Sequence, residues 1–180
     1  VVLPDSILAE GDSVEVVRRK LLNDCNLHTI LRLPTGIFYA QGVRANVLFF
    51  KNSESKSTAQ TKKTWFYDLR TNKSFTLKQR PITDSDFAEF ISLYLPDDLD
   101  SRVETWSDED VNGRWRCYEL EQLLARKKAN LDIFWIKDEA RPDIENLPEP
   151  EEMVSQVISN LEDALTLMNQ LDNSLHESRE

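Results

Sequence analysis

Residues 27–50 carry the stretch that decides the fold, LHTILRLPTGIFYAQGVRANVLFF. Isoleucine and leucine alternate with other types at its start and predict a strand over residues 27–33, which Pro34-Thr35-Gly36 ends. Residues 43–50 predict a second strand whose end is apolar on both faces. A strand buried on both faces is typical of an α/β sheet covered by helices, so we expect that fold class.

The loop between these two strands is apolar and aromatic, although an exposed turn is normally polar. Phe38 and Tyr39 lie at its centre, and Gly36 and Gly42 stand at its two ends. The loop is therefore a candidate binding element. The alternative is that one of the two aromatic side chains packs into the core.

The remaining elements of the body follow from the same periodicities. They are a helix over residues 14–22, a strand over 64–69, a turn at 71–73, a helix ending near Tyr94, a short strand over 114–118, a helix over 120–129 and an apolar run over 131–136. Asp12 or Ser13 is expected to cap the first helix. Residues 18–20, Arg-Arg-Lys, are expected mostly to face water. Thr83 and Asp86 resemble a capping box before the second helix.

An acidic linker with three prolines, residues 138–150, precedes a last helix expected over about residues 151–175. Its apolar residues follow alternate steps of four and three, a spacing typical of coiled coils. They are Val154, Ile158, Leu161, Leu165 and Met168. The helix could fold back on its own domain, but a stripe after a linker favours a partner helix.

Composition excludes several classes of protein. The chain has 180 residues, enough for one packed domain, and no run of about 18 apolar residues, so we expect no membrane span and a cytoplasmic location. It does not begin with Met, and we expect upstream sequence to be missing from it. Cys25 and Cys117 are expected to be buried or half-buried thiols, and His28 a strand residue.

The charge is unevenly distributed along the chain. Residues 51–80 contain eight Lys or Arg against Glu54 and Asp68, which makes this segment +6. Since the whole chain carries −10, the remainder carries −16. A basic surface on an acidic body can meet phosphate, although the lysines could equally keep a hairpin soluble.

The motifs for most chemistries are missing from this sequence. Only four glycines occur, and none has the spacing of a phosphate or cofactor loop. No cluster of metal ligands and no Asn-Pro pair is found in the sequence. We therefore predict no catalytic residue and no metal site within this chain.

One long ungapped pattern does point to a family. The phrase LPTGIFYAQGV-x-x-NVLFF closely resembles the modification (M) subunit of type I restriction-modification systems, an N6-adenine DNA methyltransferase. Further similar stretches are VVLPDSILAEGD, TWFYDLRTN, FTLKQRPIT with DFAEF, and NLDIFWIKD. The resemblance thus covers nearly the whole chain.

The resemblance implies the C-terminal half of a Rossmann-like class I methyltransferase sheet. Residues 1–4 would end its fifth strand, and the two strands of residues 27–50 would be the sixth and an antiparallel seventh. It implies methyltransferase sequence over residues 1–80, a family-specific extension over 81–147 and an assembly helix over 148–180. The family's S-adenosylmethionine and Asn-Pro-Pro-aromatic motifs precede this region, so we expect this cofactor in the full-length enzyme and not in the fragment.

The resemblance also assigns roles to residues. Phe38 or Tyr39, with a slight preference for Phe38, would contact the target adenine, and Gly36 and Gly42 would support the loop. Lys62, Lys63 and Lys73 would approach the phosphates of double-stranded DNA. The apolar stripe of the last helix would bind the specificity (S) subunit, and the restriction (R) subunit is a further implied partner.

Two other hypotheses compete with this one. The chain could be a non-enzymatic adaptor that binds a protein through its last helix. It could also be half of a methyltransferase completed by a second chain. The upstream genomic sequence separates them, because in-frame glycine and Asn-Pro-Pro-aromatic motifs would support the first interpretation.

Overall fold

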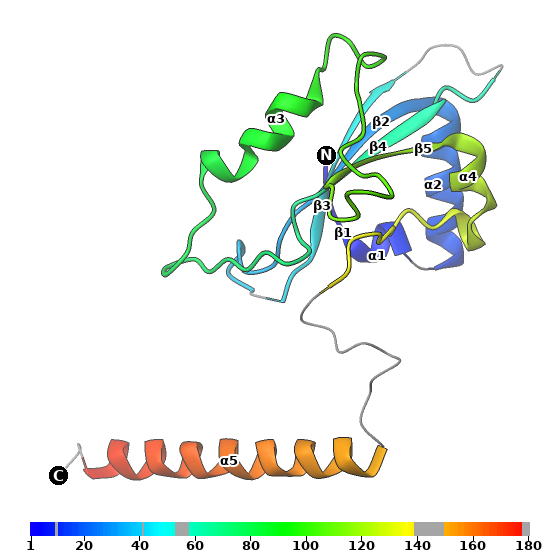
Figure 1. Ribbon diagram of the computed structural model, residues 1–180. Coiled ribbons are helices and arrows are strands. Elements are labelled where there is room, and N and C mark those ends of the chain that lie inside the picture. The colour runs from blue at the N-terminus through cyan, green and yellow to red at the C-terminus, as the bar shows by residue number, and fades with distance from the viewer. Residues whose placement is uncertain (10, 41, 53–57, 139–149, 178–180) are drawn as a thin grey trace. The chain divides into compact units, whose positions relative to one another are not determined.

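The computed structural model describes residues 1–9, 11–40, 42–52, 58–138 and 150–177 (Figure 1). The chain divides into two compact units, residues 1–138 and residues 139–180. The first unit holds the sheet, and the described part of the second is a single helix. Each unit is described by itself.

A mixed five-stranded sheet forms the centre of the first unit. Its strands are β1 (Val2–Pro4), β2 (Cys25–Arg32), β3 (Ala45–Asn52), β4 (Lys63–Asp68) and β5 (Trp115–Glu119), in the order β1-β3-β2-β4-β5. β3 is antiparallel to both β1 and β2, β4 is parallel to β2, and β5 is antiparallel to β4. Because β1, β2 and β4 run in one direction, their carboxyl ends meet at one edge of the sheet.

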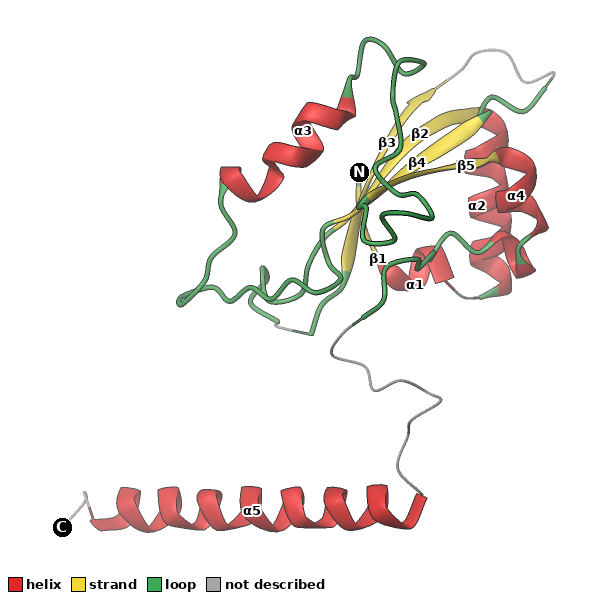
Figure 2. Ribbon diagram, viewed as in Figure 1, coloured by secondary structure: helices red, strands yellow, loops and turns green. Residues whose placement is uncertain are grey.

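Helices cover both faces of this sheet (Figure 2). One side holds α1 (Asp5–Ala9), α2 (Asp12–Asp24), α4 (Leu120–Ala125) and the 3-10 turn η2 (Lys127–Ala129); the other holds the 3-10 turn η1 (Asp84–Phe87) and α3 (Ala88–Tyr94). Each face of the sheet has its own hydrophobic core: the first core lies between the sheet and α1, α2 and α4, and the second lies between the sheet and α3. Phe66 of β4 belongs to the first core, whereas its neighbours Trp65 and Tyr67 belong to the second. The expected α/β class with strands buried on both faces is confirmed.

β2 reaches the first core with an irregular spacing. Leu27 and Ile30 both belong to that core although they are three positions apart, an odd offset that would place them on opposite faces of a regular strand. The pairing of β2 with β3 shifts between Leu27 and Thr29, and this bulge restores the facing of the strand. Leu31 then faces the second core.

The prediction for the first helix was wrong in two respects. α2 begins after Gly11 as N-cap and has no side-chain capping bond, so neither Asp12 nor Ser13 caps it. Arg18, expected to face water, is 1% exposed. Its guanidinium donates from Nη1 to the carbonyl of Ile7 at 2.8 Å and from Nε to that of Ala129 at 3.1 Å.

The same arginine explains why the helix predicted over residues 120–129 ends at Ala125. Arg18 Nη2 also donates to the carbonyl of Lys128 at 2.8 Å. Lys128 and Ala129 have φ values of 57° and 47°, in the left-handed region that a continuous α-helix excludes. Residues 127–129 therefore form a turn whose carbonyls bind the buried Arg18, and they do not continue the helix.

One other segment differs in detail from its prediction. The capping box of Thr83 and Asp86 is confirmed, but it begins η1, and the α-helix starts at Ala88. The apolar run over residues 131–136, for which no element was predicted, has no regular secondary structure and places Leu131 and Ile133 in the first core.

The described part of the second unit is α5 (Pro150–Glu177), which confirms the predicted helix. Each of the five stripe residues, from Val154 to Met168, is between 51% and 67% exposed. None of the helices in the described ranges is long and apolar enough to cross a membrane.

Candidate nucleic-acid interface

The carboxyl ends of β1, β2 and β4 lead into three segments at one edge of the sheet. They are the start of α1 at Asp5, the aromatic loop (residues 34–44) and the basic turn (residues 69–80). Ligands of open α/β sheets bind outside the carboxyl ends of the strands. This edge is therefore the candidate site, and it contains five of the predicted residues, namely Gly36, Phe38, Tyr39, Gly42 and Lys73.

Arg70 closes the aromatic loop at its base. Its Nε donates to the carbonyl of Leu33 at 2.9 Å, and its Nη2 donates to the carbonyl of Ala45 at 3.1 Å. Both terminal nitrogens also bind the carboxylate of Asp5, at 2.6 and 2.9 Å. Although Arg70 belongs to the basic segment of the sequence, its side chain is 10% exposed and serves as a structural tie.

Asp5 is ionised in this arrangement. Burial alone would raise the pKa of its carboxyl, but the hydrogen bonds and charge of Arg70 outweigh burial, and the pKa lies below its usual value. Asn46 adds a hydrogen bond from Nδ2 to Asp5 Oδ1 at 2.7 Å. The start of α1, β3 and the basic turn are thus joined through one carboxylate.

The basic turn is shaped by the buried carboxylate of Asp68. Its Oδ1 accepts hydrogen bonds from the backbone N–H groups of Arg70 and Thr71 at 2.7 and 2.8 Å. Asn72 adopts a φ of 58°. Arg114 donates to the carbonyls of Asp68 and Thr71 at 2.6 and 2.9 Å. The predicted turn at residues 71–73 is confirmed.

Gly36 brings the aromatic loop into backbone contact with the basic turn. Its φ is 83°, and a Cβ built on it would lie 1.8 Å from the carbonyl oxygen of Phe75. A Cβ built on Gly42 would meet no atom within 4 Å. Only the first of the two predicted loop glycines therefore lies where a side chain has no room.

Phe38 and Tyr39 occupy different environments. Phe38 is half-buried and packs against the second core, whereas Tyr39 is 97% exposed. Of the two aromatic side chains, Phe38 is therefore the one that packs against the core, as the alternative interpretation of the sequence allowed. Tyr39 presents its ring at the surface of the carboxyl edge.

The three predicted lysines do not gather on one surface. Lys62 and Lys63 stand at the start of β4, and Lys73 follows its end, so about 20 Å of strand separates them. Lys63 pairs with Asp100 at 3.4 Å. Lys73 instead shares the basic turn with two exposed cations that sequence reasoning did not single out.

These two cations are Lys78 and Arg80, in the part of the basic turn that the sequence FTLKQR already marks. Thr76 donates its N–H to the carbonyl of Arg80 at 3.0 Å, and the guanidinium of Arg80 lies 5.2 Å from the ring centre of Phe75. The turn is therefore held in one shape. Its cations stand on the segment that contacts Gly36.

Burial moves the pKa values of two groups elsewhere in the first unit away from neutral pH. Burial, assisted by the charge of Arg102, lowers the pKa of His28 to about 4, and burial raises the pKa of the Cys117 thiol to about 11. Both cysteines are free and half-buried, as predicted. Among the described residues, no group of three or more His, Cys, Asp or Glu could hold a metal ion.

Comparison with known proteins shows which family this chain resembles. The model of the N-6 DNA methylase family matches residues 1–126. The type I restriction enzyme EcoKI methylase subunit of Escherichia coli (strain K12) is 38% identical over 205 residues, which cover 100% of this chain and 39% of that protein. The StySJI methylase subunit of Salmonella typhimurium (strain LT2) is 39% identical over 190 residues, 92% of this chain and 36% of that protein.

Solved structures agree with the sequence comparison. The crystal structure of the EcoKI M protein superimposes with a TM-score of 0.66 at 36% identity, over 97% of this chain and 40% of that one. A structure concerning complex assembly and conformational transition of the type I R-M system gives 0.59 at 27% identity, over 98% of this chain and 35% of that one. The chain spans about two fifths of the length of the curated relatives it matches.

Proposed function

Because the chain belongs to the N-6 DNA methylase family, whose model matches residues 1–126, we propose that it is part of the adenine-N6 DNA methyltransferase subunit of a type I restriction-modification system. The chain contributes a wall of the target-base pocket, a DNA-facing edge and a helix for subunit assembly. The observation that carries this proposal is the exposed ring of Tyr39, in a loop that contacts the basic turn through Gly36.

Methylation of adenine N6 requires the base outside the duplex, because the amine is stacked and paired inside it. An extruded base stacks on an aromatic side chain, and such a contact is worth about 1–3 kcal/mol. The sequence slightly favours Phe38 for this role, whereas the exposures favour Tyr39. Phe38 then anchors the loop on the second core.

The cations of the basic turn are the proposed phosphate contacts beside this base. Lys73, Lys78 and Arg80 lie on the segment that touches Gly36, so phosphate and base would be bound from neighbouring loops. Lys62 and Lys63 remain proposed contacts to a more distant phosphate, at the other end of β4.

The family uses S-adenosylmethionine as methyl donor, and we propose that residues outside this chain hold it. Of its four glycines, Gly36 and Gly113 have their free faces filled by backbone carbonyls, at 1.8 and 2.1 Å from a built Cβ. They form no open cradle for a cofactor. We therefore assign no cofactor contact and no methyl-transfer step to the residues of this chain.

The exposed stripe of α5 supports subunit assembly. Burying a large aliphatic side chain is worth about 1.5–3 kcal/mol, so five exposed ones favour burial against a partner protein. We assign this role to a helix of the specificity subunit, with the restriction subunit and double-stranded DNA as further partners. We also propose that the methyltransferase portion spans residues 1–80, that the family-specific extension spans residues 81–147, and that the protein is cytoplasmic.

The base-pocket role is tested in the full-length subunit assembled with its specificity subunit. Tyr39→Ala should reduce methylation of a cognate duplex by about 5- to 150-fold, the factor that corresponds to one lost stacking contact. Tyr39→Phe keeps a ring and should retain most of the activity. Normal methylation by Tyr39→Ala would show that the pocket has been assigned to the wrong residue.

An adaptor without enzymatic activity is the second candidate, favoured by the same exposed stripe. Deletion of residues 151–180 should abolish co-purification with the specificity subunit and leave the thermal melt of the first unit unchanged. Retained assembly would refute the partner role of α5. Methylation by the intact assembly separates the two candidates, because an adaptor would show none.

A further inference from the structure

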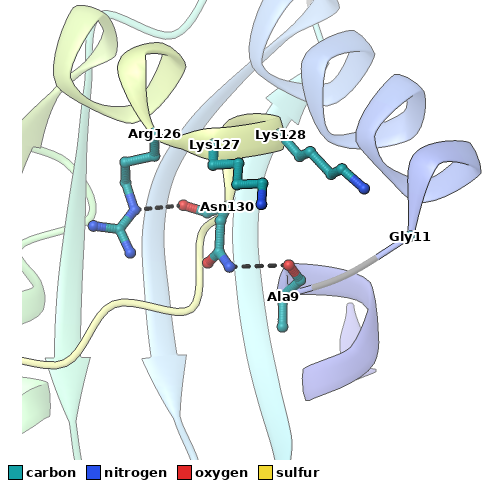
Figure 3. A pocket seen from close by; sticks show the side chains of 6 residues that line it. All are labelled: Ala9, Gly11, Arg126, Lys127, Lys128 and Asn130. Atoms are coloured by element: carbon teal, nitrogen blue, oxygen red, sulfur yellow. Dashed lines mark hydrogen bonds between the residues drawn. The ribbon is translucent and has the colours of Figure 1, made fainter.

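A hollow of about 560 Å³ lies between the α1–α2 junction and the turn after α4 (Figure 3). Its lining residues are Ala9, Gly11, Arg126, Lys127, Lys128 and Asn130. The carboxyl-edge site described above uses none of these residues. Three consecutive cations line one wall of this hollow.

The two walls of the hollow are tied to each other. Asn130 Nδ2 donates to the carbonyl of Ala9 at 2.9 Å, and Arg126 Nε donates to the carbonyl of Asn130 at 2.8 Å (Figure 3). Behind the wall, Arg18 binds the carbonyls of Lys128 and Ala129. The hollow is therefore preformed.

The backbone of this wall is strained. Lys128 and Ala129 have φ values of 57° and 47°, in the left-handed region that is unfavourable for residues that carry a Cβ. Strained residues persist where surrounding contacts hold them, and they are found preferentially at binding sites. The strain does not identify a ligand, but it fixes where the lysine side chains begin.

The charges of this wall are only partly compensated. Lys128 pairs with Asp12 at 2.5 Å. Arg126 donates to the neutral carbonyls of Asn130 and Asp132, so its positive charge remains. Lys127 is exposed and forms no ion pair with any residue in the described ranges. Arg126 and Lys127, which have no ion-pair partner among the described residues, thus face a hollow whose volume lies in the range of small-ligand sites.

We propose that this hollow binds a phosphate group, held by Arg126 and Lys127 with Lys128 at its rim. A guanidinium next to two ammonium groups matches the charge and the several acceptor oxygens of phosphate. The group can come from a free phosphorylated ligand or from a DNA backbone. This inference does not depend on the proposed methyltransferase function.

The test uses the purified 180-residue chain and two probes, inorganic tripolyphosphate and a 20-base-pair duplex, followed by calorimetric titration at low salt. Lys127→Gln alone and combined with Arg126→Gln should weaken binding by about tenfold or more. Lys20→Gln is the matched control, because Lys20 is an exposed lysine near the other end of α2, paired with Asp24 at 2.8 Å. This control should bind as the unmodified chain does.

The outcomes separate the two sources. Charge-dependent binding of tripolyphosphate alone identifies a free phosphorylated ligand, and charge-dependent binding of the duplex identifies backbone phosphate. Absence of saturable binding for both probes would overturn the proposal. Equal affinity of the Lys127→Gln variant and the unmodified chain would overturn it as well, because the bound anion would then lie elsewhere.

Discussion

Replacing Gly36 by alanine tests whether the aromatic loop and the basic turn are held by direct backbone contact. The new Cβ would lie 1.8 Å from the carbonyl oxygen of Phe75 and 2.8 Å from its carbonyl carbon. Real Cβ contacts do not approach that closely, so one of the two backbone segments must move. Gly42→Ala is the matched control in the same loop, since its Cβ meets nothing within 4 Å.

The expected cost has two parts. At a φ of 83°, alanine loses about 1–2 kcal/mol relative to glycine. Forcing an extra methyl group into a packed contact costs about 1–3 kcal/mol more. We therefore expect Gly36→Ala to lower the free energy of unfolding by about 2–5 kcal/mol, and Gly42→Ala to change it by less than about 0.5 kcal/mol.

Tryptophan fluorescence during urea unfolding measures this difference. The sequence has four tryptophans, and all of them lie in the first unit, where Trp65 and Trp115 stack with ring centres 5.2 Å apart. The signal therefore reports on the unit that contains Gly36. If both alanine variants unfold at the same urea concentration as the unmodified chain, the described contact between Gly36 and Phe75 is incorrect.

Three further predictions concern buried groups. The pKa of His28 is lowered to about 4, mainly by burial, and an unfolded histidine titrates near 6.5, so the unfolded state alone takes up a proton between these values. Stability should thus fall by about 2 kcal/mol from pH 8 to pH 5, and His28→Phe, measured by urea unfolding against a His176→Gln control, should remove this loss. Arg18→Met leaves three carbonyls without their donor and should destabilise the first unit by about 3 kcal/mol or more in the same assay; a smaller change would mean that water replaces the guanidinium. Because burial raises the pKa of Cys117 to about 11, roughly one molecule in a thousand carries its thiolate at pH 8, and mass spectrometry should find slow alkylation by iodoacetamide until urea unfolds the chain.

Local patterns predicted the elements whose side chains alternate regularly. β2, β3 and β4 were expected from their apolar residues, and the helices that cover the sheet bury β2 and β4 on both faces, whereas the end of β3, expected to be buried in this way, is exposed at Phe50. A spacing rule needs no knowledge of distant residues. This explains why the strands and the last helix were predicted within a few residues of their ends.

The errors arise where a distant residue decides the local structure. Arg18 lies 110 residues from Lys128, and a helical pattern gives no sign that its guanidinium will bind that turn. Arg70 resembles any other cation of the basic segment, because its partner Asp5 is 65 residues away. The choice between Phe38 and Tyr39 likewise depends on which ring meets the second core.

The hydrogen bonds of Arg70 to the aromatic loop and to Asp5 have a consequence for protein engineering. Arg70 binds the carbonyls at both ends of the aromatic loop, and Gly36 within that loop touches Phe75 of the basic turn. A chimera that exchanges residues 34–44 alone would leave the donor sequence facing a turn shaped for another loop. Residues 34–44 and 69–80 should therefore be grafted together, with Asp5 retained as their common counter-ion.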